Sequence, residues 1–559
     1  MPTAHKRLLL ALLAIGYLWL FPWAEKLHNP NEMVRVYSVR AIAEYGTYAI
    51  GRRTVTANGN VIDSGPLVQQ WGYVNDKAIC CDDPAAKKPH CTGNLFAAKA
   101  PGLNQLGAVP HLVLDRLWKT ATGHGPPKAV LLWWLRLWLA MLPSIVGFWW
   151  LANHLTATLR RPQLGLAVVL AAAFGSLALT YGQMFAGHQP AAMALVLAYG
   201  AIAGTTREYA SKMRLFVAGL GVGLATLIEF TAAPAGLILL VWLLLRRQRV
   251  ADLPWIVLGG LGPALLLAHF DYKAFGAPWR LPYGYVENAG FVQDMAPGFF
   301  GIHLPNVEKT AGSLLSPYTG LYFWAPWTAL AWLGLLAVKR TVANGEASLW
   351  TDQRGNALVA WGICLYFLFF QCTHSLWRGG WVVGPRYITA MVPFAALAVA
   401  YFGDRLGGRQ AVVFDLGLAV AAATAIVVTG AATAVCQGFP LEVYNPLSEV
   451  VGPLLRNGWT WSSPLYWLGM AALPAAMPWA IALAIAALWA IVGLQPAGLR
   501  VRGWPMRAVG ATGVAVVVAL AVWGLWSVPS RRTPEERMET VKFLTETWFP
   551  QPVRGAKGF

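Results

Sequence analysis

Residues 29–50 read NPNEMVRVYSVRAIAEYGTYAI and decide the fold, because they directly follow an apolar run at positions 8–23. Their apolar side chains recur at helical rather than strand spacing, which predicts a half-apolar helix lying along the bilayer surface beside a membrane span. Glu32 and Arg35 stand three residues apart and therefore share one face of that helix. A carboxylate and a guanidinium held there suit chemistry, although a solvated ion pair on a surface helix explains the same spacing.

The composition predicts a protein embedded in a lipid bilayer. Of its 559 residues, 57% are hydrophobic and only 12% are charged. Long apolar runs recur along the whole chain, and one membrane span needs about 20 such residues. The net charge of +18 does not indicate nucleic acid as a partner, because the basic residues gather in short loops at every second crossing.

Four regions are predicted for this all-α polytopic membrane protein. Residues 1–23 are an uncleaved first transmembrane helix, since no small-residue cleavage site follows them. Residues 24–128 form a long extracytoplasmic loop that carries juxtamembrane helices. Residues 129–527 are the transmembrane bundle, and 528–559 are an extracytoplasmic tail with a short helix near 534–548.

A bundle of about thirteen transmembrane helices is expected in total. The region 213–245 also fits one broken hairpin, and 465–494 also fits a re-entrant or tilted piece. Because short inner loops face long outer ones, we expect function at the outer loops 271–316, 372–386 and 436–464. The spans after the first are expected at 129–151, 164–182, 190–205, 213–230, 234–245, 255–270, 317–338, 357–373, 387–403, 411–435, 465–494 and 507–527.

Three of the six cysteines share the first long loop, which is predicted to be outside the cytoplasm. A disulfide between Cys91 and either Cys80 or Cys81 is expected there, and the sequence does not choose between the two pairings. A zinc site that uses His90 as its fourth ligand matches no standard spacing.

Polar side chains gather at one predicted depth, the outer boundary of the membrane. Polar groups at membrane depth are costly, so each one predicts a function. Any one of them alone is explained as an interfacial residue that reaches for water, but their common level predicts a shared cavity. The substrate-binding candidates at this level are His188, Glu229, Asp271, Tyr285, His374, Arg378 and Arg386.

Basic residues on tight turns predict a phosphate site. Lys99 stands directly before an Ala-Pro-Gly turn, and Arg386 follows a Gly-Pro pair. Such a fixed cation suits a phosphate or a pyrophosphate. Because no P-loop, dinucleotide fingerprint, H-E-x-x-H or G-x-S-x-G motif occurs, enzymes driven by cytoplasmic nucleotides are disfavoured. Arg136 lies inside an apolar run and needs a partner that the sequence does not name.

Short motifs scattered between about residues 30 and 395 resemble those of one family. They are Asn31-Glu32 with Arg35, Asp76-Lys77-Ala78, Lys99-Ala-Pro-Gly102, His188, Glu229, Asp271 with FGAP at 275–278, LLSPYTGLYFWAP at 314–326 and Gly384-Pro-Arg-Tyr387. With these motifs the chain resembles the GT-C membrane glycosyltransferases, the superfamily of the protein O-mannosyltransferases and the lipid A aminoarabinose transferase. It looks most like largely uncharacterised bacterial members of that group.

The resemblance implies an enzyme of the bacterial inner membrane with its active site on the extracytoplasmic side. Such an enzyme moves a sugar from a polyprenyl-phosphate donor to a glycan, lipid or protein acceptor. The acidic residue after the first span then serves as catalytic base or orients the acceptor, a role that falls on Glu32. Relatives usually carry Asp followed by Glu, where this chain has Asn31 and Glu32.

The resemblance also assigns the donor phosphate to basic residues. Lys99 matches the family's basic residue of the first loop, Arg386 is the second phosphate candidate, and Arg35 and Asp76 complete the expected substrate site. An acidic residue often precedes that lysine in relatives, but Ala98 stands here. The resemblance therefore gives no metal ligands, and it leaves a divalent cation open.

Two other classes of membrane protein fit parts of the pattern. A transporter or flippase for a lipid-linked or anionic substrate needs polar residues near the bilayer centre, whereas the polar residues here cluster at one face. An O-antigen polymerase or ligase also uses lipid-linked sugars, but the long first loop with its juxtamembrane helix argues against that class.

Overall fold

The chain forms a mostly helical membrane protein in its computed structural model, which describes residues 2–23, 29–55, 58, 61–65, 67–68, 74–80, 93–295, 301–337, 353–495 and 504–548. Within these residues, seven helical segments are long and apolar enough to cross a membrane, and three shorter apolar helices accompany them. The seven are Lys128–Thr158, Phe230–Arg247, Val250–Phe275, Arg354–Thr373, Arg386–Gly403, Gly408–Val435 and Ala508–Trp526, and the shorter ones are Pro162–Phe174, Pro326–Leu336 and Met477–Gly493.

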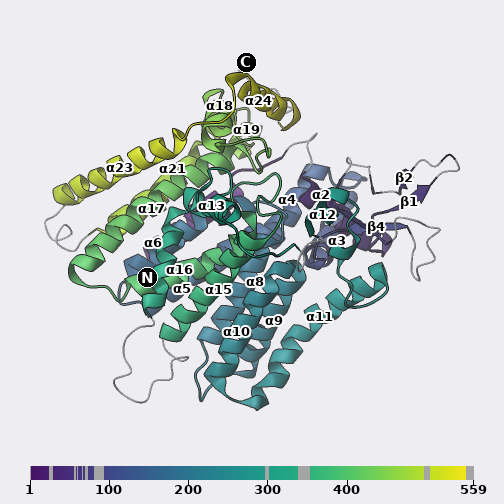
Figure 1. Cartoon of the computed structure of the whole chain (residues 1–559), viewed down its shortest axis with the longest axis horizontal. Coiled ribbons are helices and arrows are strands. Elements are labelled where there is room, and N and C mark those ends of the chain that lie inside the picture. The colour runs from purple at the N-terminus through teal and green to yellow at the C-terminus, as the bar shows by residue number, and fades with distance from the viewer. Residues whose placement is uncertain are drawn as a thin grey trace.

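The bundle of Figure 1 is built from helices that lie side by side, with α8 to α11 forming one flank. Its first half contains α1 (Thr3–Leu18), α4 (Lys128–Arg136), the π-helical turn η1 (Leu137–Met141), α5 (Leu142–Thr158), α6 (Pro162–Phe174), α7 (Leu177–Tyr181), α8 (His188–Ala203), α9 (Lys212–Ile228), η2 (Phe230–Ala232), α10 (Ala233–Arg247), η3 (Val250–Asp252) and α11 (Leu253–Phe275). Its second half contains α14 (Leu321–Trp324), η5 (Pro326–Ala337), α15 (Gln353–Thr373), η6 (Arg386–Met391), α16 (Val392–Gly403), α17 (Gly408–Val435), α21 (Met477–Gly493) and α23 (Trp504–Trp526).

Shorter elements connect and cover these helices. They are α2 (Pro30–Tyr45), α3 (Gly102–Thr122), η4 (Pro282–Tyr285), α12 (Ala289–Met295), α13 (Val307–Leu315), the π-helical turn η7 (Leu447–Val451), α18 (Gly452–Arg456), α19 (Pro464–Trp467), α20 (Ala472–Ala475) and α24 (Pro534–Trp548). The last of them is the helix that the sequence predicts near 534–548.

Three predicted spans are interrupted in the structure. The span expected at 164–182 breaks after α6, where the side chain of Ser176 accepts a hydrogen bond from Ala178 N and starts α7. The span expected at 317–338 is a short α14 followed by the 3₁₀ helix η5. The span expected at 465–494 is divided into α19, α20 and α21, each of which begins with or contains a proline. The described residues therefore do not establish a count of thirteen.

The helix α2 begins and ends where local chemistry dictates. The side chain of Asn29 accepts a hydrogen bond from Asn31 N, and Pro30 occupies the first turn, as is usual at a helix start. Gly46 ends the helix in the left-handed conformation, with φ of +63°. The helix is buried over most of its length, with Glu32 only 2% and Arg35 only 1% exposed. The interpretation of a surface helix with a solvated ion pair is therefore wrong.

The expectation of an all-α fold misses a small sheet in the first long loop. Four antiparallel strands lie in the order β2-β1-β4-β3 and protrude at one edge of the molecule (Figure 1). The strands are β1 (Gly51–Val55), β2 (Val61–Ser64), β3 (Lys77–Ile79) and β4 (Asn94–Ala97). Strands of three to five residues are too short for an alternating pattern to stand out from the surrounding loop.

A network of charges ties this sheet to the loop that follows α11. The buried Lys77 Nζ lies 2.6 Å from Asp63 Oδ2 and 3.3 Å from Glu287 Oε2. Arg53 binds the same two carboxylates. Burial would raise the pKa of Asp63, but the hydrogen bonds from Arg53 and Lys77 hold it below its usual range. The network fixes η4, which ends two residues before Glu287, against β3.

Candidate functional site

The β3–β4 hairpin places Asp76 and Lys99 next to each other. Lys77 pairs with Ala97 in the ladder, so the residue before β3 meets the residues after β4. Ala98 N donates a hydrogen bond to Asp76 O at 2.9 Å, and Lys99 Nζ lies 3.2 Å from Asp76 Oδ2. The hairpin therefore explains why two motifs more than twenty positions apart act as one unit.

Arg35 connects this unit to α2. Its Nη1 donates to Ala100 O at 3.1 Å, and its Nε donates to Asn31 Oδ1 at 3.1 Å. The next turn is equally close to α9, because a Cβ added to Gly102 would lie 2.6 Å from Leu227 O. Only glycine allows this approach, which brings the Lys99–Gly102 turn to the end of α9.

Glu229 lies at that end of α9, in extended backbone between α9 and η2. Its Oε2 is 3.4 Å from Nδ1 of His188, which is the first residue of α8. A Cβ added to Gly187 would lie 2.7 Å from Glu229 Oε2 and 3.3 Å from Arg35 Nη2. The Glu229 carboxylate and the Arg35 guanidinium thus share the space above Gly187.

The electrostatics of this cluster favour an anion. Three cations, Arg35, Lys99 and Arg386, act on Glu229, and with Asp76 as the second carboxylate the balance is 3 − 2 = +1. Burial raises the pKa of Glu229 above its usual range even though the three cations lower it. Burial also lowers the pKa of the Arg35 guanidinium, against the opposing effect of Glu229.

Aromatic side chains form the wall beside these charges. The His188 ring meets Tyr181 and Tyr387 edge-on, with centroids 5.9 and 5.8 Å apart. Tyr387 Oη accepts a hydrogen bond from Arg386 Nη2 at 3.2 Å and its ring lies 5.5 Å from His374. The Nε of Arg386 is buried and has no hydrogen-bond partner within the part of the chain that the structure describes. We refer to Arg35, Asp76, Lys99, His188, Glu229 and Arg386 as the charged cluster.

Glu32 lies outside the charged cluster, in a buried clamp of its own. Its two carboxylate oxygens accept hydrogen bonds from Arg136 Nε and Nη2, and Oε1 also accepts one from Phe185 N at 2.6 Å. Arg136 Nη1 donates to Pro22 O at 2.5 Å. This clamp supplies the partner that the sequence does not name for Arg136. The assignment of Glu32 as catalytic base stays a prediction.

Two other predicted site residues, Arg378 and Tyr285, are engaged elsewhere, and a third, Asp271, is buried on α11. Arg378 donates from Nη2 to Leu441 O at 2.7 Å and stacks over Tyr318. Tyr285 stacks on Phe275 with centroids 4.4 Å apart. Asp271 is 1% exposed, and neither carboxylate oxygen has a hydrogen-bond partner among the described residues.

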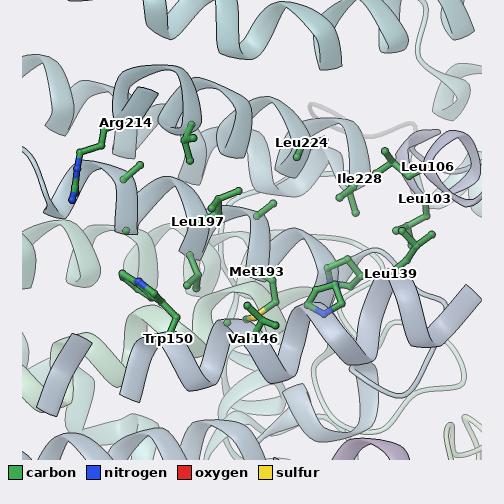
Figure 2. Close-up of a pocket in the computed structure, with 18 of the residues that line it drawn as sticks. Leu103, Leu106, Leu139, Val146, Trp150, Met193, Leu197, Arg214, Leu224 and Ile228 are labelled. Carbon is green, nitrogen blue, oxygen red and sulfur yellow. The ribbon is translucent and has the colours of Figure 1, made fainter. Parts of the chain in front are cut away.

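An apolar groove leads along the bundle to the charged cluster. It holds about 630 Å³ and is lined by residues of α3, η1, α5, α8 and α9. Figure 2 shows Arg214 at one end and Leu103, Leu106 and Ile228 at the other. Ile228 directly precedes Glu229, so the second end of the groove lies beside the charged cluster.

No metal centre is evident in the described ranges. They contain no group of three or more His, Cys, Asp and Glu side chains that could hold a metal ion. The predicted disulfide and the alternative zinc site depend on Cys81, Cys91 and His90, which lie outside the described residues. Cys80 is described and is buried against Phe96 and Phe275.

Comparison with known proteins gives distant structural likeness alone. No protein-family model matches the chain, and no curated protein matches it. It is similar to the crystal structure of ArnT from Cupriavidus metallidurans bound to undecaprenyl phosphate, with 14% identity over 94% of this chain and 78% of that chain, and a TM-score of 0.43. The apo structure of the same ArnT gives 15% identity, the same coverage and a TM-score of 0.41. A likeness this distant assigns neither a family nor an activity.

Several residues of the site are missed by sequence reasoning. Gly187 leaves the space that Glu229 and Arg35 occupy, and Tyr181 and Tyr283 border the cluster from α7 and η4. The sequence gives weak signals for them, since a glycine before His188, a tyrosine at the end of an apolar run and a tyrosine after Pro282 are all common patterns. Arg136 is noticed as a charge in an apolar run, but its partner lies 104 positions away.

Proposed function

We propose that this protein is an integral membrane glycosyltransferase that moves a sugar from a polyprenyl-phosphate donor to an acceptor at the outer face of the membrane. The carrying observation is that three cations act on Glu229, and that Ile228, the residue before it, lines one end of an apolar groove. A lipid phosphate has the matching chemistry, because its head is anionic and its tail is a long hydrocarbon.

The cations suit the phosphate of such a donor. Arg386 has a buried Nε without a hydrogen-bond partner among the described residues, and Lys99 is held on its turn by Asp76. Charge-assisted hydrogen bonds from these two groups would neutralise the negative charge that develops on the departing phosphate. Arg35 contributes a third positive charge from α2.

The groove suits the prenyl chain. Its lining is almost entirely aliphatic and aromatic, and it includes Leu103, just after the Lys99–Gly102 turn, and Ile228, which directly precedes Glu229. A chain lying in it would present its phosphate to Lys99, which is four residues before Leu103. The Tyr387, His188 and Tyr181 rings beside the cations then supply a wall for the sugar.

Binding and turnover of lipid phosphates test this function. In nanodiscs, undecaprenyl phosphate should bind the wild type, and Lys99→Ala or Arg386→Ala should each weaken binding by about 10- to 100-fold, since one charge-assisted hydrogen bond contributes about 1.5–3 kcal/mol. Arg378→Ala is the matched control, because that guanidinium is engaged with Leu441 O.

The same preparation separates transfer from transport. Sugar-loaded undecaprenyl phosphates are supplied as donors, and the release of undecaprenyl phosphate is followed together with movement of the intact donor across vesicle membranes. Release of the sugar supports a glycosyltransferase. Movement of the intact donor without release supports a transporter or flippase instead.

A further inference from the structure

We propose that Glu229 is the general base that accepts the proton of the acceptor, and that Glu32 has a structural role in its clamp with Arg136. This assignment rests on the proposed function and names the residue that would perform its central step. It follows from comparing the surroundings of the carboxylates in and near the charged cluster.

The carboxylate oxygens of Glu32 are occupied by donors of the protein itself. Its oxygens accept three hydrogen bonds, two from the Arg136 guanidinium and one from Phe185 N. Its side chain is buried against that guanidinium, with Oε2 2.8 Å from Arg136 Nη2, so its oxygens are already occupied by other donors. The neighbouring Asn31 carries an amide that cannot act as a base, and its Oδ1 accepts the hydrogen bond of Arg35 Nε.

Asp76 and Asp271 are also poorly placed. Asp76 lies 3.2 Å from the Lys99 ammonium group and its main chain closes the β3–β4 hairpin. Proton uptake there would remove the partner of a phosphate-binding cation. Asp271 lies on α11, and none of the three cations of the charged cluster acts on its carboxylate, in contrast to Glu229.

Glu229 has the position that a base needs. It directly follows Ile228, which lines the groove, and it lies above Gly187 with Oε2 3.4 Å from His188 Nδ1. Burial raises its pKa, which brings the carboxylate closer to the range in which a general base works best near neutral pH. The charged and titratable groups that act on it or are affected by it are Arg35, Lys99, His188, Tyr283, Tyr366 and Arg386.

The reaction then balances within the charged cluster. The acceptor O–H or N–H loses its proton to the Glu229 carboxylate while its heteroatom forms a bond to the anomeric carbon of the sugar. The bond from that carbon to the phosphate oxygen breaks, and its electron pair leaves with the polyprenyl phosphate. Lys99 and Arg386 stabilise the negative charge that collects on this leaving group.

The test compares Glu229→Gln with Glu32→Gln, using undecaprenyl phosphate binding and release of undecaprenyl phosphate from sugar-loaded donors. Glu229→Gln should lower the single-turnover rate by about 10²- to 10⁴-fold. Its undecaprenyl phosphate binding should stay as tight as in the wild type or become tighter, because a negative charge beside three cations is removed. The wild-type rate should rise with pH as Glu229 deprotonates, and the Glu229→Gln rate should not follow that rise.

Glu32→Gln should behave differently. Its thermal unfolding midpoint should fall. The turnover rate of the protein that remains folded should stay within a few-fold of the wild-type rate and should depend on pH as the wild-type rate does. The base assignment alone is overturned if Glu229→Gln turns over at the wild-type rate, or if its rate has the same pH profile as that of the wild type. Absence of undecaprenyl phosphate binding by the wild type overturns the proposed function instead.

Discussion

The carboxylate of Glu32 accepts two hydrogen bonds from Arg136, from Nε at 2.9 Å and from Nη2 at 2.8 Å, and joins α2 to α4. The two side chains are 3% and 2% exposed. Arg136 also donates to Pro22 O, which follows α1. Three segments that are distant in the sequence are thereby fixed to one buried ion pair, and α2 in turn carries Arg35 into the charged cluster.

Removing one partner of this pair should destabilise the protein strongly. Arg136→Met leaves the Glu32 carboxylate buried without its cation, a change that typically costs about 3–5 kcal/mol. The free energy of unfolding, or the thermal midpoint in detergent, measures the loss. Arg40→Met is the matched control on the same helix, since the Arg40–Glu44 pair is more exposed and contributes about 0.5 kcal/mol. Equal losses in the two variants would contradict a structural role for the clamp.

The contact between α2 and α3 should stabilise the protein less as the pH falls. Burial would raise the pKa of Glu44, but hydrogen bonds from His111 of α3 and from Arg40 lower it from 4.5 to about 2. A carboxyl whose folded pKa is depressed stabilises the fold above its unfolded pKa and loses that contribution as the pH falls through the folded value. The stabilisation is therefore complete above about pH 4.5 and disappears towards pH 2.

Thermal midpoints of the wild type and Glu44→Gln measure this contribution. The wild type should unfold at a higher temperature at pH 6, and the difference should shrink as the pH is lowered from about 4.5 to about 2. Glu546→Gln, taken from the exposed Lys542–Glu546 pair of α24, is the control and should change the midpoint little. A constant difference between wild type and Glu44→Gln at every pH would contradict the prediction.

Local patterns in the sequence predict much of the helical structure, and distant pairings are what they miss. The helix within residues 29–50 and the helix at 534–548 follow from local patterns alone. The partner of Arg136 and the sheet order do not, because both depend on contacts between segments far apart in the chain. Of the predicted site residues, the structure gathers Arg35, Asp76, Lys99, His188, Glu229 and Arg386, whereas Glu32, three residues before Arg35 on α2, forms its ion pair with Arg136 of α4.

A methyl group at Gly187 should disturb the charged cluster. An added Cβ would lie 2.7 Å from Glu229 Oε2 and 2.8 Å from the Ile228 carbonyl oxygen, which is backbone and gives way poorly. We expect Gly187→Ala to lose about 1–3 kcal/mol of stability through overpacking and to alter undecaprenyl phosphate binding. Gly362→Ala is the control, because nothing lies within 4 Å of its added Cβ and alanine favours the helix α15 by about 1 kcal/mol. A Gly187→Ala variant as stable as Gly362→Ala would show that Glu229 has room to move.

Filling the groove should block long lipids and spare short ones. Leu197 lines the groove on α8 and is 44% exposed, so a larger side chain there projects into the open space without displacing the core. Leu197→Trp should weaken undecaprenyl phosphate binding at least tenfold, because the prenyl chain loses its apolar contact surface. A short-chain prenyl phosphate should bind Leu197→Trp and wild type alike, since its head reaches Lys99 and Arg386 without occupying the groove at Leu197. Leu237→Trp on α10 is the control, as that position is 61% exposed and does not line the groove.

Equal weakening of binding for both prenyl chain lengths in Leu197→Trp would place the effect in the charged cluster. Unchanged binding of undecaprenyl phosphate would show that the prenyl chain leaves the protein by another route.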